Sequence, residues 1–148
     1  MKNKKGFTLV ELLAVIVVLG IVSAIAVTSI AGIRRKAADD TFKELEHQIA
    51  ELGPAIYSHE VIVRNSSATF YSKYKEGNEF IVPLGTLISS GYLKEIQSPY
   101  NSSETCEGYL YVNPASTDEV YKGYLKCGSK ESAGYRPISN TATISDIN

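Results

Sequence analysis

The sequence predicts an α+β protein in which one long N-terminal helix packs on a small antiparallel β-sheet. Three observations support this fold class. An apolar run occupies residues 7–33, an apolar stripe with helical spacing continues to residue 56, and alternating side chains lie between two cysteines near the C-terminus. Most of the 15 basic and 16 acidic side chains follow residue 33. This division excludes a simple cytoplasmic enzyme, and the lack of a second run of roughly 20 apolar residues excludes a protein with several membrane spans.

A short basic leader, Met1-Lys2-Asn3-Lys4-Lys5-Gly6, precedes the apolar run, which begins at Phe7. The run is too long for a secretory signal peptide, whose apolar region has about 7 to 15 residues. As a helix it would be about 40 Å long and would cross the roughly 30 Å hydrocarbon core of a bilayer. Glu11 is its only formal charge. Two interpretations of Glu11 are open, because a carboxylate in hydrocarbon needs either the polar interface or a partner.

The segment Lys5-Gly6-Phe7-Thr8-Leu9-Val10-Glu11-Leu12-Leu13 resembles the class III signal of type IV prepilins and pseudopilins. This resemblance implies a type IV pilin-like fold, cleavage between Gly6 and Phe7 by a membrane prepilin peptidase, and N-methylation of Phe7. It also implies that Glu11 is an assembly residue that pairs with the amine of Phe7 on a neighbouring subunit. The pairing is physically reasonable, since two charges that are each costly in hydrocarbon are better tolerated together.

The resemblance divides the chain into four segments. These are a leader peptide at 1–6, an apolar transmembrane and filament-core helix at 7–33, the amphipathic half of the same helix at 34–56, and a globular pilin head at 57–148. Where many family members have a helix-breaking proline, this chain has Thr28, while Gly20 matches a common glycine. The sequence leaves open whether the helix is kinked or melted between them, because glycine loosens a helix by about 1 kcal/mol and proline by about 3 kcal/mol.

The amphipathic segment has apolar residues spaced three and four apart, which is typical of a helix buried along one side. They are Ala38, Phe42, Leu45, Ile49, Leu52 and Ile56. The stripe covers only about three heptads, which disfavours a coiled-coil partner and favours a sheet of the same chain. Gly53-Pro54 predicts that the helix ends or bends near Leu52, because proline lacks the N–H that a helix requires.

The first part of the head has weaker signals. Two short strands are possible at residues 61–63 and 79–82, with a polar loop at 65–67 between them. Pro83 predicts the start of a short helix through Leu84, Leu87 and Ile88, and Gly91 predicts its end. Residues 87–94, Leu-Ile-Ser-Ser-Gly-Tyr-Leu-Lys, resemble a segment of pilin-like proteins of Gram-positive bacteria.

A hairpin is predicted between Cys106 and Cys127, with residues 113–120 as its turn region. Pairing these cysteines opposite one another also aligns residue 110 with 123 and residue 112 with 121. One face then carries Cys106, Gly108, Leu110, Val112, Tyr121, Gly123, Leu125 and Cys127, and the other carries Glu107, Tyr109, Tyr111, Lys122, Tyr124 and Lys126. In an exported domain a disulfide is the simplest use of the cysteines, and their spacing disfavours a zinc site or redox motif. The family resemblance implies that residues 114–119 form an exposed loop.

No sequence feature indicates catalysis. His47 and His59 do not belong to a His-Glu-x-x-His motif, and no phosphate-binding loop or nucleophile elbow is present, so we expect no enzymatic activity, no cofactor and no metal. Removal of the leader takes away three lysines, leaving 12 basic and 16 acidic side chains, so direct nucleic-acid binding is not expected. The ten tyrosines all follow residue 56, where core and cross-strand packing is their favoured role.

These observations lead to the hypothesis of a type IV pilus subunit that serves adhesion, motility or DNA uptake. The expected partners are further copies of the chain in a helical homopolymer, the prepilin peptidase, and the assembly ATPase and membrane platform. The precursor would cross the inner (cytoplasmic) membrane once, and the mature subunit would lie in an extracellular surface pilus. Two alternatives are a pseudopilin of a type II secretion or competence system and a signal-anchored extracellular binding domain that does not polymerise. The cysteine pair and the length of the head favour a pilin.

Overall fold

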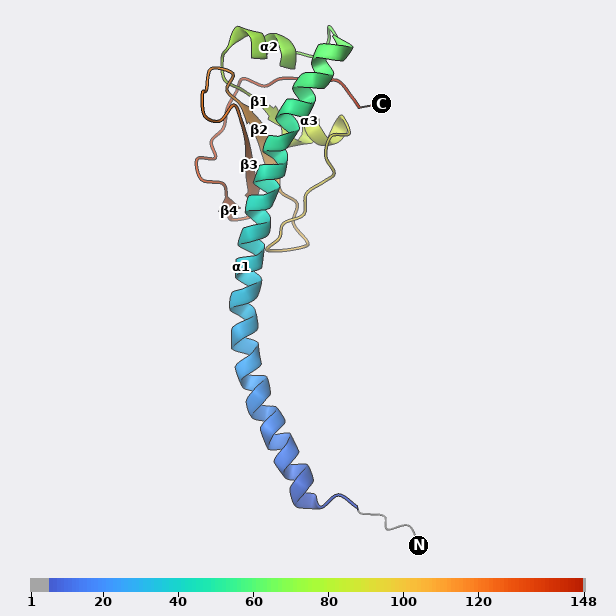
Figure 1. Ribbon diagram of the computed structural model, residues 1–148, viewed down its shortest axis with the longest axis vertical. Coiled ribbons are helices and arrows are strands. Elements are labelled where there is room, and N and C mark those ends of the chain that lie inside the picture. The colour runs from blue at the N-terminus through green and yellow to red at the C-terminus, as the bar shows by residue number, and fades with distance from the viewer. Residues whose placement is uncertain (1–5, 148) are drawn as a thin grey trace. The chain divides into compact units, whose positions relative to one another are not determined.

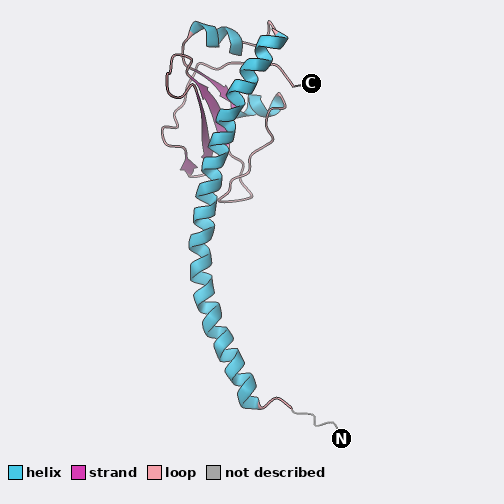
Figure 2. Ribbon diagram, viewed as in Figure 1, coloured by secondary structure: helices cyan, strands magenta, loops and turns pink. Residues whose placement is uncertain are grey.

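The structure is a computed structural model that describes residues 6–147, apart from the side chains of residues 27–29. It contains three helices and four strands in the described residues (Figures 1 and 2). They are α1 (Leu9–Val63), α2 (Phe70–Glu76), β1 (Phe80–Pro83), α3 (Leu84–Ser89), β2 (Glu107–Val112), β3 (Tyr121–Cys127) and β4 (Lys130–Glu131). The contacts divide the chain into two compact units, Met1–Ala37 and Ala38–Asn148. The predicted α+β class, with a long N-terminal helix and a small antiparallel sheet as in a pilin-like fold, is confirmed.

The N-terminal unit contains the first part of α1. Its backbone is helical without interruption from Gly20 to Thr28, so this stretch is not melted. The hydroxyl of Ser23 donates a hydrogen bond to the carbonyl oxygen of Leu19 at 2.7 Å. This bond satisfies the hydroxyl on the surface of an apolar helix, where no water would be available to it in a bilayer.

In the second unit, α1 buries the predicted apolar stripe. Phe42, Ile49 and Ile56 are buried in the core, and Leu45 and Leu52 pack against it. The expectation that a sheet of the same chain would cover this side is confirmed. A Cβ at Gly123 of β3 would lie only 2.0 Å from the carbonyl oxygen of Glu46, so the strand and the helix backbones are nearly in contact.

The prediction that the helix ends near Leu52 is wrong, because α1 continues through Pro54 to Val63. Ile49 precedes the proline and Ile56 follows it, and both are fully buried. An interior proline destabilises a helix by roughly 3 kcal/mol, and burial of these two side chains offsets that cost. The possible strand at residues 61–63 is also wrong, since these residues form the last turn of α1.

All neighbouring strands of the sheet are antiparallel, in the order β1-β2-β3-β4. The register of β2 and β3 is the predicted one, with Leu110 opposite Gly123 and Val112 opposite Tyr121. The predicted strand at residues 79–82 corresponds to β1. The helix predicted after Pro83 is α3, and Gly91 follows it in the left-handed region at φ 83°. The short elements α2 and β4 were not predicted.

Tyr109 lies on the face of the hairpin opposite to Leu110, as predicted, and it is only 4% exposed. The segment that follows β4 covers Tyr109. The hydroxyl of Tyr109 donates a hydrogen bond to the carbonyl oxygen of Arg136 in this segment, at 2.7 Å. The alternation of faces was therefore predicted correctly, but the covering segment was not.

The C-terminal segment, residues 139–147, completes the second unit without forming a regular element. Its backbone pairs with the free edge of β1, where Ala142 donates to the carbonyl oxygen of Ile81 at 2.8 Å. The carbonyl oxygen of Thr143 accepts from the N–H groups of Thr69 and Phe70 at the start of α2. This pairing protects a sheet edge that would otherwise present unpaired backbone groups.

Candidate functional site

The bond between Gly6 and Phe7 lies in a short non-helical segment directly before α1. The side chain of Phe7 is 85% exposed. No described residue lies within 4 Å of the position that a Cβ at Gly6 would occupy, so packing in the described part of the chain does not require glycine there. Exposed non-helical backbone is the form in which proteases reach a peptide bond. The rest of the predicted leader, residues 1–5, lies outside the described residues.

Thr8 and Glu11 form a capping box at the start of α1. One carboxylate oxygen of Glu11, Oε2, accepts hydrogen bonds from the backbone N–H and from the hydroxyl of Thr8, both at 2.9 Å. The backbone N–H of Glu11 donates to the hydroxyl oxygen of Thr8 at 3.3 Å. These bonds satisfy polar groups that would have no partner within the helix. Thr8 was not predicted as a capping residue, although the Thr-x-x-Glu spacing before an apolar run is a signature of this cap.

The carboxylate of Glu11 has only neutral partners within the described part of a single chain. Within the described residues it forms no ion pair. The nitrogen of Phe7 belongs here to the peptide bond with Gly6, so the amine that was predicted to pair with Glu11 is absent from this chain. The structure thus places Glu11 with Thr8, and the predicted partner requires cleavage and a second subunit.

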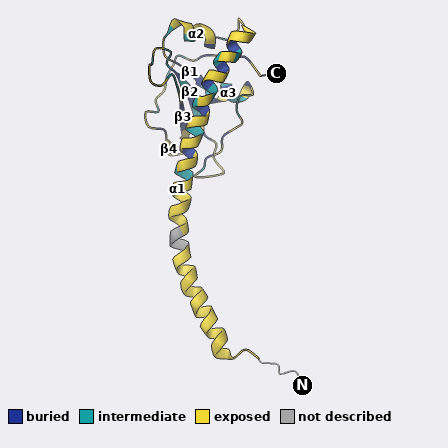
Figure 3. Ribbon diagram, viewed as in Figure 1, coloured by how far each residue is buried: buried dark blue, intermediate teal, exposed yellow. Residues whose placement is uncertain are grey.

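The apolar residues that follow the cap are exposed on all sides of α1 (Figure 3). The large ones are Leu9, Val10, Leu12, Leu13, Val15, Ile16, Val17, Val18, Leu19, Ile21, Val22, Ile25, Ile30 and Ile33. Within the described residues, α1 is one helix that is long and apolar enough to cross a membrane, and none of its most apolar window is buried inside the chain. Such a surface is unfavourable in water at roughly 25 cal/mol per Å², so it needs lipid or other protein around it.

Cys106 and Cys127 form the expected disulfide at the open end of the hairpin, with a Cα–Cα distance of 4.3 Å. Both cysteines are buried in the core. The loop between β2 and β3 includes the exposed residues Ala115, Thr117, Asp118 and Glu119. Asn113 orders its start, since its side-chain oxygen accepts from the N–H of Ala115 at 3.2 Å.

The two histidines lie apart and do not form a common site. The imidazole of His47 lies 3.2 Å from the carboxylate of Glu51 on the exposed surface of α1. The Nδ1 atom of His59 lies 2.8 Å from the hydroxyl of Tyr92. Among the described residues, no group of three or more His, Cys, Asp or Glu side chains is arranged to hold a metal ion.

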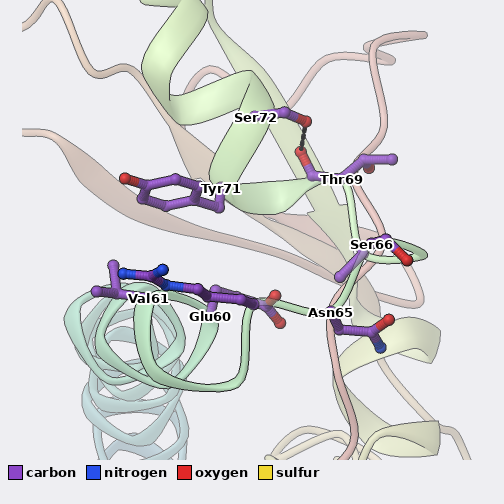
Figure 4. Close-up of a pocket in the computed structure, with 9 residues that line it drawn as sticks. Glu60, Val61, Asn65, Ser66, Thr69, Tyr71 and Ser72 are labelled. Atoms are coloured by element: carbon purple, nitrogen blue, oxygen red, sulfur yellow. Dashed lines mark hydrogen bonds between the residues drawn. The ribbon is translucent and has the colours of Figure 1, made fainter.

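A pocket of about 480 Å³ lies at the C-terminal end of α1, between this helix, the loop of residues 64–69 and α2. Its lining residues are Glu60, Val61, Arg64, Asn65, Ser66, Ala68, Thr69, Tyr71 and Ser72. Figure 4 shows Tyr71 of α2 across from Val61 and Glu60 of α1, with Asn65 and Ser66 on the connecting loop. No function was predicted for these residues, because they become neighbours only when α1 extends past Pro54.

Comparison with known proteins gives one match. Residues 1–27 match the prokaryotic N-terminal methylation motif, which is the class III signal peptide of type IV pilins and pseudopilins. No curated protein and no solved structure matches the chain. The motif supports processing of the prepilin type and points to a structural subunit. Together with the apolar helix, it indicates anchoring in a membrane.

Proposed function

We propose that this chain is a structural subunit of a type IV pilus. The prepilin peptidase cuts between Gly6 and Phe7 and methylates the new terminus, and an assembly ATPase with its membrane platform moves the mature subunit into a surface filament. The filament then serves adhesion, motility or DNA uptake. The observation that carries the proposal is the exposed apolar surface of α1 between Leu9 and Ile33. Most of it lies within the methylation motif of residues 1–27, and no described part of the chain covers its described side chains.

This apolar surface has two compatible environments. In the membrane, lipid tails surround it, and helices associate there through packing rather than through a hydrophobic driving force. Once a subunit leaves the bilayer, this surface is shielded from water only if other apolar helices pack against it. A bundle of identical helices therefore offers the mature subunit a cover outside the membrane, and this supports self-polymerisation into a homopolymer.

Glu11 supplies the contact that sets the position of one subunit against the next. Cleavage converts the nitrogen of Phe7 into a charged amine, and Glu11 holds a carboxylate whose partners within the chain are the neutral groups of Thr8. A charge pair between Phe7 of one subunit and Glu11 of the next lowers the cost of both charges in an apolar surrounding. The capping box keeps the Glu11 carboxylate at the start of α1, near the terminus of its own chain.

The decisive experiment compares Glu11→Ala with Glu44→Ala in cells. Glu44 is an exposed acid on α1 outside the apolar run, where it accepts a hydrogen bond from Gln48. Glu11→Ala should leave subunits in the membrane, cut before Phe7, and remove them from sheared fibres, whereas Glu44→Ala should assemble normally. N-terminal sequencing and intact mass of both fractions give the processing state.

The alternatives predict different outcomes. An anchored binding domain would be favoured if the Glu11→Ala variant is displayed normally at the surface and neither this variant nor the unmodified protein forms fibres. A methylated Phe7 in short periplasmic or envelope-bound assemblies, with no extended surface fibre, would favour a pseudopilin. Retention of Met1 in the unmodified protein would contradict prepilin processing altogether.

A further inference from the structure

The pocket at the end of α1 contains a residue whose backbone conformation is unusual for its type. Arg64 follows the last turn of the helix with φ 49°, in the left-handed region that favours glycine. Its N–H donates to the carbonyl oxygen of Glu60 at 3.1 Å, which is the bond expected where a left-handed residue ends a helix. A non-glycine residue in this region raises the free energy of the folded chain by on the order of 1 kcal/mol. The backbone conformation at residue 64 therefore favours glycine, yet the residue there is an arginine.

The guanidinium of Arg64 has no hydrogen-bond or ion-pair partner among the residues that the structure describes. The carboxylate of Glu60 is directed to Ser145 instead, from which it accepts two hydrogen bonds at 2.5 and 3.2 Å. In this pocket the guanidinium of Arg64 is therefore available to a ligand. The carboxylate oxygens of Glu60 already accept hydrogen bonds from Ser145.

The other polar groups of the pocket reinforce this bias toward donors. The side-chain oxygen of Asn65 accepts from the N–H of Ser67 at 3.0 Å, so its NH₂ group is the part left to a ligand. The hydroxyl of Ser66 adds a donor in the same loop. A ligand that suits these groups is rich in acceptor oxygens and carries a negative charge, because a guanidinium binds carboxylates through two parallel hydrogen bonds.

An aromatic wall faces the polar groups. The ring of Tyr71 is 39% exposed and lies beside Tyr57, with 6.0 Å between ring centroids. Val61 lies on the opposite side of the opening (Figure 4). Flat apolar faces of this kind accommodate the C–H surface of a sugar ring, and the volume lies within the range of small-ligand sites.

We propose that this pocket binds an acidic sugar, a ring that carries a carboxylate. Arg64 holds the carboxylate, Asn65 and Ser66 donate to ring oxygens, and Tyr71 packs against the ring. The site belongs to the second compact unit and does not depend on polymerisation, so it stands or falls separately from the proposed filament role.

The test uses the full-length chain in detergent micelles and isothermal titration calorimetry. The acidic probes are a hyaluronan tetrasaccharide and sialyllactose, and the neutral probes are chitotetraose and lactose. Inorganic phosphate serves as a simple anion. At least one acidic probe should bind, and its affinity should exceed that of its neutral counterpart and of phosphate by about tenfold or more, as expected for the loss of a charge-assisted pair of hydrogen bonds.

The variants separate the pocket from net charge and from folding. Arg64→Gly and Arg64→Asn remove the guanidinium, and both new residues tolerate the left-handed backbone, so each should keep or raise the thermal stability while weakening the acidic probe about tenfold. Lys75→Gln removes one exposed positive charge from α2 outside the pocket lining and should change the affinity less than about twofold.

Five results would overturn the proposal. Three concern the probes: neither acidic probe binds, the neutral probes bind equally well, or phosphate binds equally well. Two concern the variants: Arg64→Gly leaves the affinity unchanged, or Lys75→Gln weakens it as much as Arg64→Gly does. Fibre formation by Arg64→Gly subunits is expected to be normal, which distinguishes failure of this site from failure of the filament proposal.

Discussion

The carboxylate of Glu60, in the last turns of α1, accepts hydrogen bonds from the backbone N–H and the hydroxyl of Ser145, 85 residues later in the chain. Glu60 is only 2% exposed. A buried carboxylate is tolerated when such donors satisfy it, and here the donors come from the C-terminal segment. The part of α1 beyond Pro54 and the C-terminal segment therefore stabilise one another.

Loss of this contact should destabilise the second unit. Glu60→Ala leaves the N–H of Ser145 without its acceptor and should lower the free energy of unfolding by about 2 to 3 kcal/mol. Urea unfolding followed by near-ultraviolet circular dichroism reports this unit, because all ten tyrosines follow residue 56. The exposed Glu44→Ala should cost less than about 0.5 kcal/mol. Equal losses in the two variants would show that the bonds to Ser145 contribute nothing.

The close approach of β3 to α1 predicts a strong effect at Gly123. A Cβ there would lie 2.0 Å from the backbone oxygen of Glu46 and 2.9 Å from the Cβ of Ile49. Gly123→Ala should therefore force the helix and sheet apart and cost about 1 to 3 kcal/mol, the range typical of overpacking. Gly85→Ala is the matched control, since nothing lies within 4 Å of its Cβ position and alanine favours helix α3. Thermal unfolding of both variants tests this prediction, and Gly123→Ala should have the lower melting temperature. Similar melting temperatures would contradict the close packing of Gly123 against α1.

The disulfide should stabilise the hairpin by constraining the unfolded chain. Cys106 and Cys127 are 21 residues apart, and closing a loop of this size contributes about 3 kcal/mol. The double variant Cys106→Ser and Cys127→Ser should lose this amount in urea unfolding, and reductant should affect only the unmodified protein. A variant as stable as the oxidised protein would mean that the bond carries no such contribution.

The hydrogen bond from Tyr100 to Asp39 predicts a measurable response to alkaline pH. The hydroxyl of Tyr100 donates to Oδ1 of Asp39 at 2.6 Å. Burial first, and then this bond to the carboxylate, raises the pKa of Tyr100 to about 12. Because the folded-state pKa lies above the ordinary value of about 10, the contribution of Tyr100 to stability is complete below pH 10 and is lost as the pH rises toward 12.

Titration of phenolate absorbance checks this expectation in single variants. Tyr100→Phe should remove one phenol that titrates near pH 12. Asp39→Asn should keep that phenol but lower its pKa, since the negative charge that disfavours phenolate is gone. Tyr92 offers a comparison, because its pKa is also raised to about 12, mainly by burial, without a contribution from Asp39. An unchanged titration curve in Asp39→Asn would contradict the role of the carboxylate.

Acidic pH should also weaken the hydrogen bond between Tyr100 and Asp39, because it protonates the carboxylate of Asp39. The pKa of Asp39 is lowered, first by the hydrogen bond from Tyr100 and then by the one from Lys130. A lowered folded-state pKa gives stability that is present above the ordinary value of about 4 and is lost as the pH falls through the folded value. The melting temperature of Asp39→Asn should therefore depend less on pH in this acidic range than that of the unmodified protein.

Much of the architecture follows from local patterns in the sequence. The N-terminal methylation motif at residues 1–27 was recognisable because it is a short linear segment of the sequence. The stripe through Phe42 and Ile49 and the register of the hairpin were predictable because helical and strand periodicity belong to neighbouring residues. The disulfide pairing followed from that register, since the two cysteines stand opposite one another at the open end of the hairpin.

Tertiary contacts decided the rest. Local propensity favours an end of the helix near Pro54, but burial of Ile49 and Ile56 on the sheet carries α1 on to Val63. The burial of Tyr109 and of Glu60 depends on segments that approach them from far along the chain. The pocket around Arg64 exists only because of the same extension of α1. Periodicity in sequence encodes which side of an element is apolar, whereas the identity of what covers that side comes from residues that only the folded chain brings together.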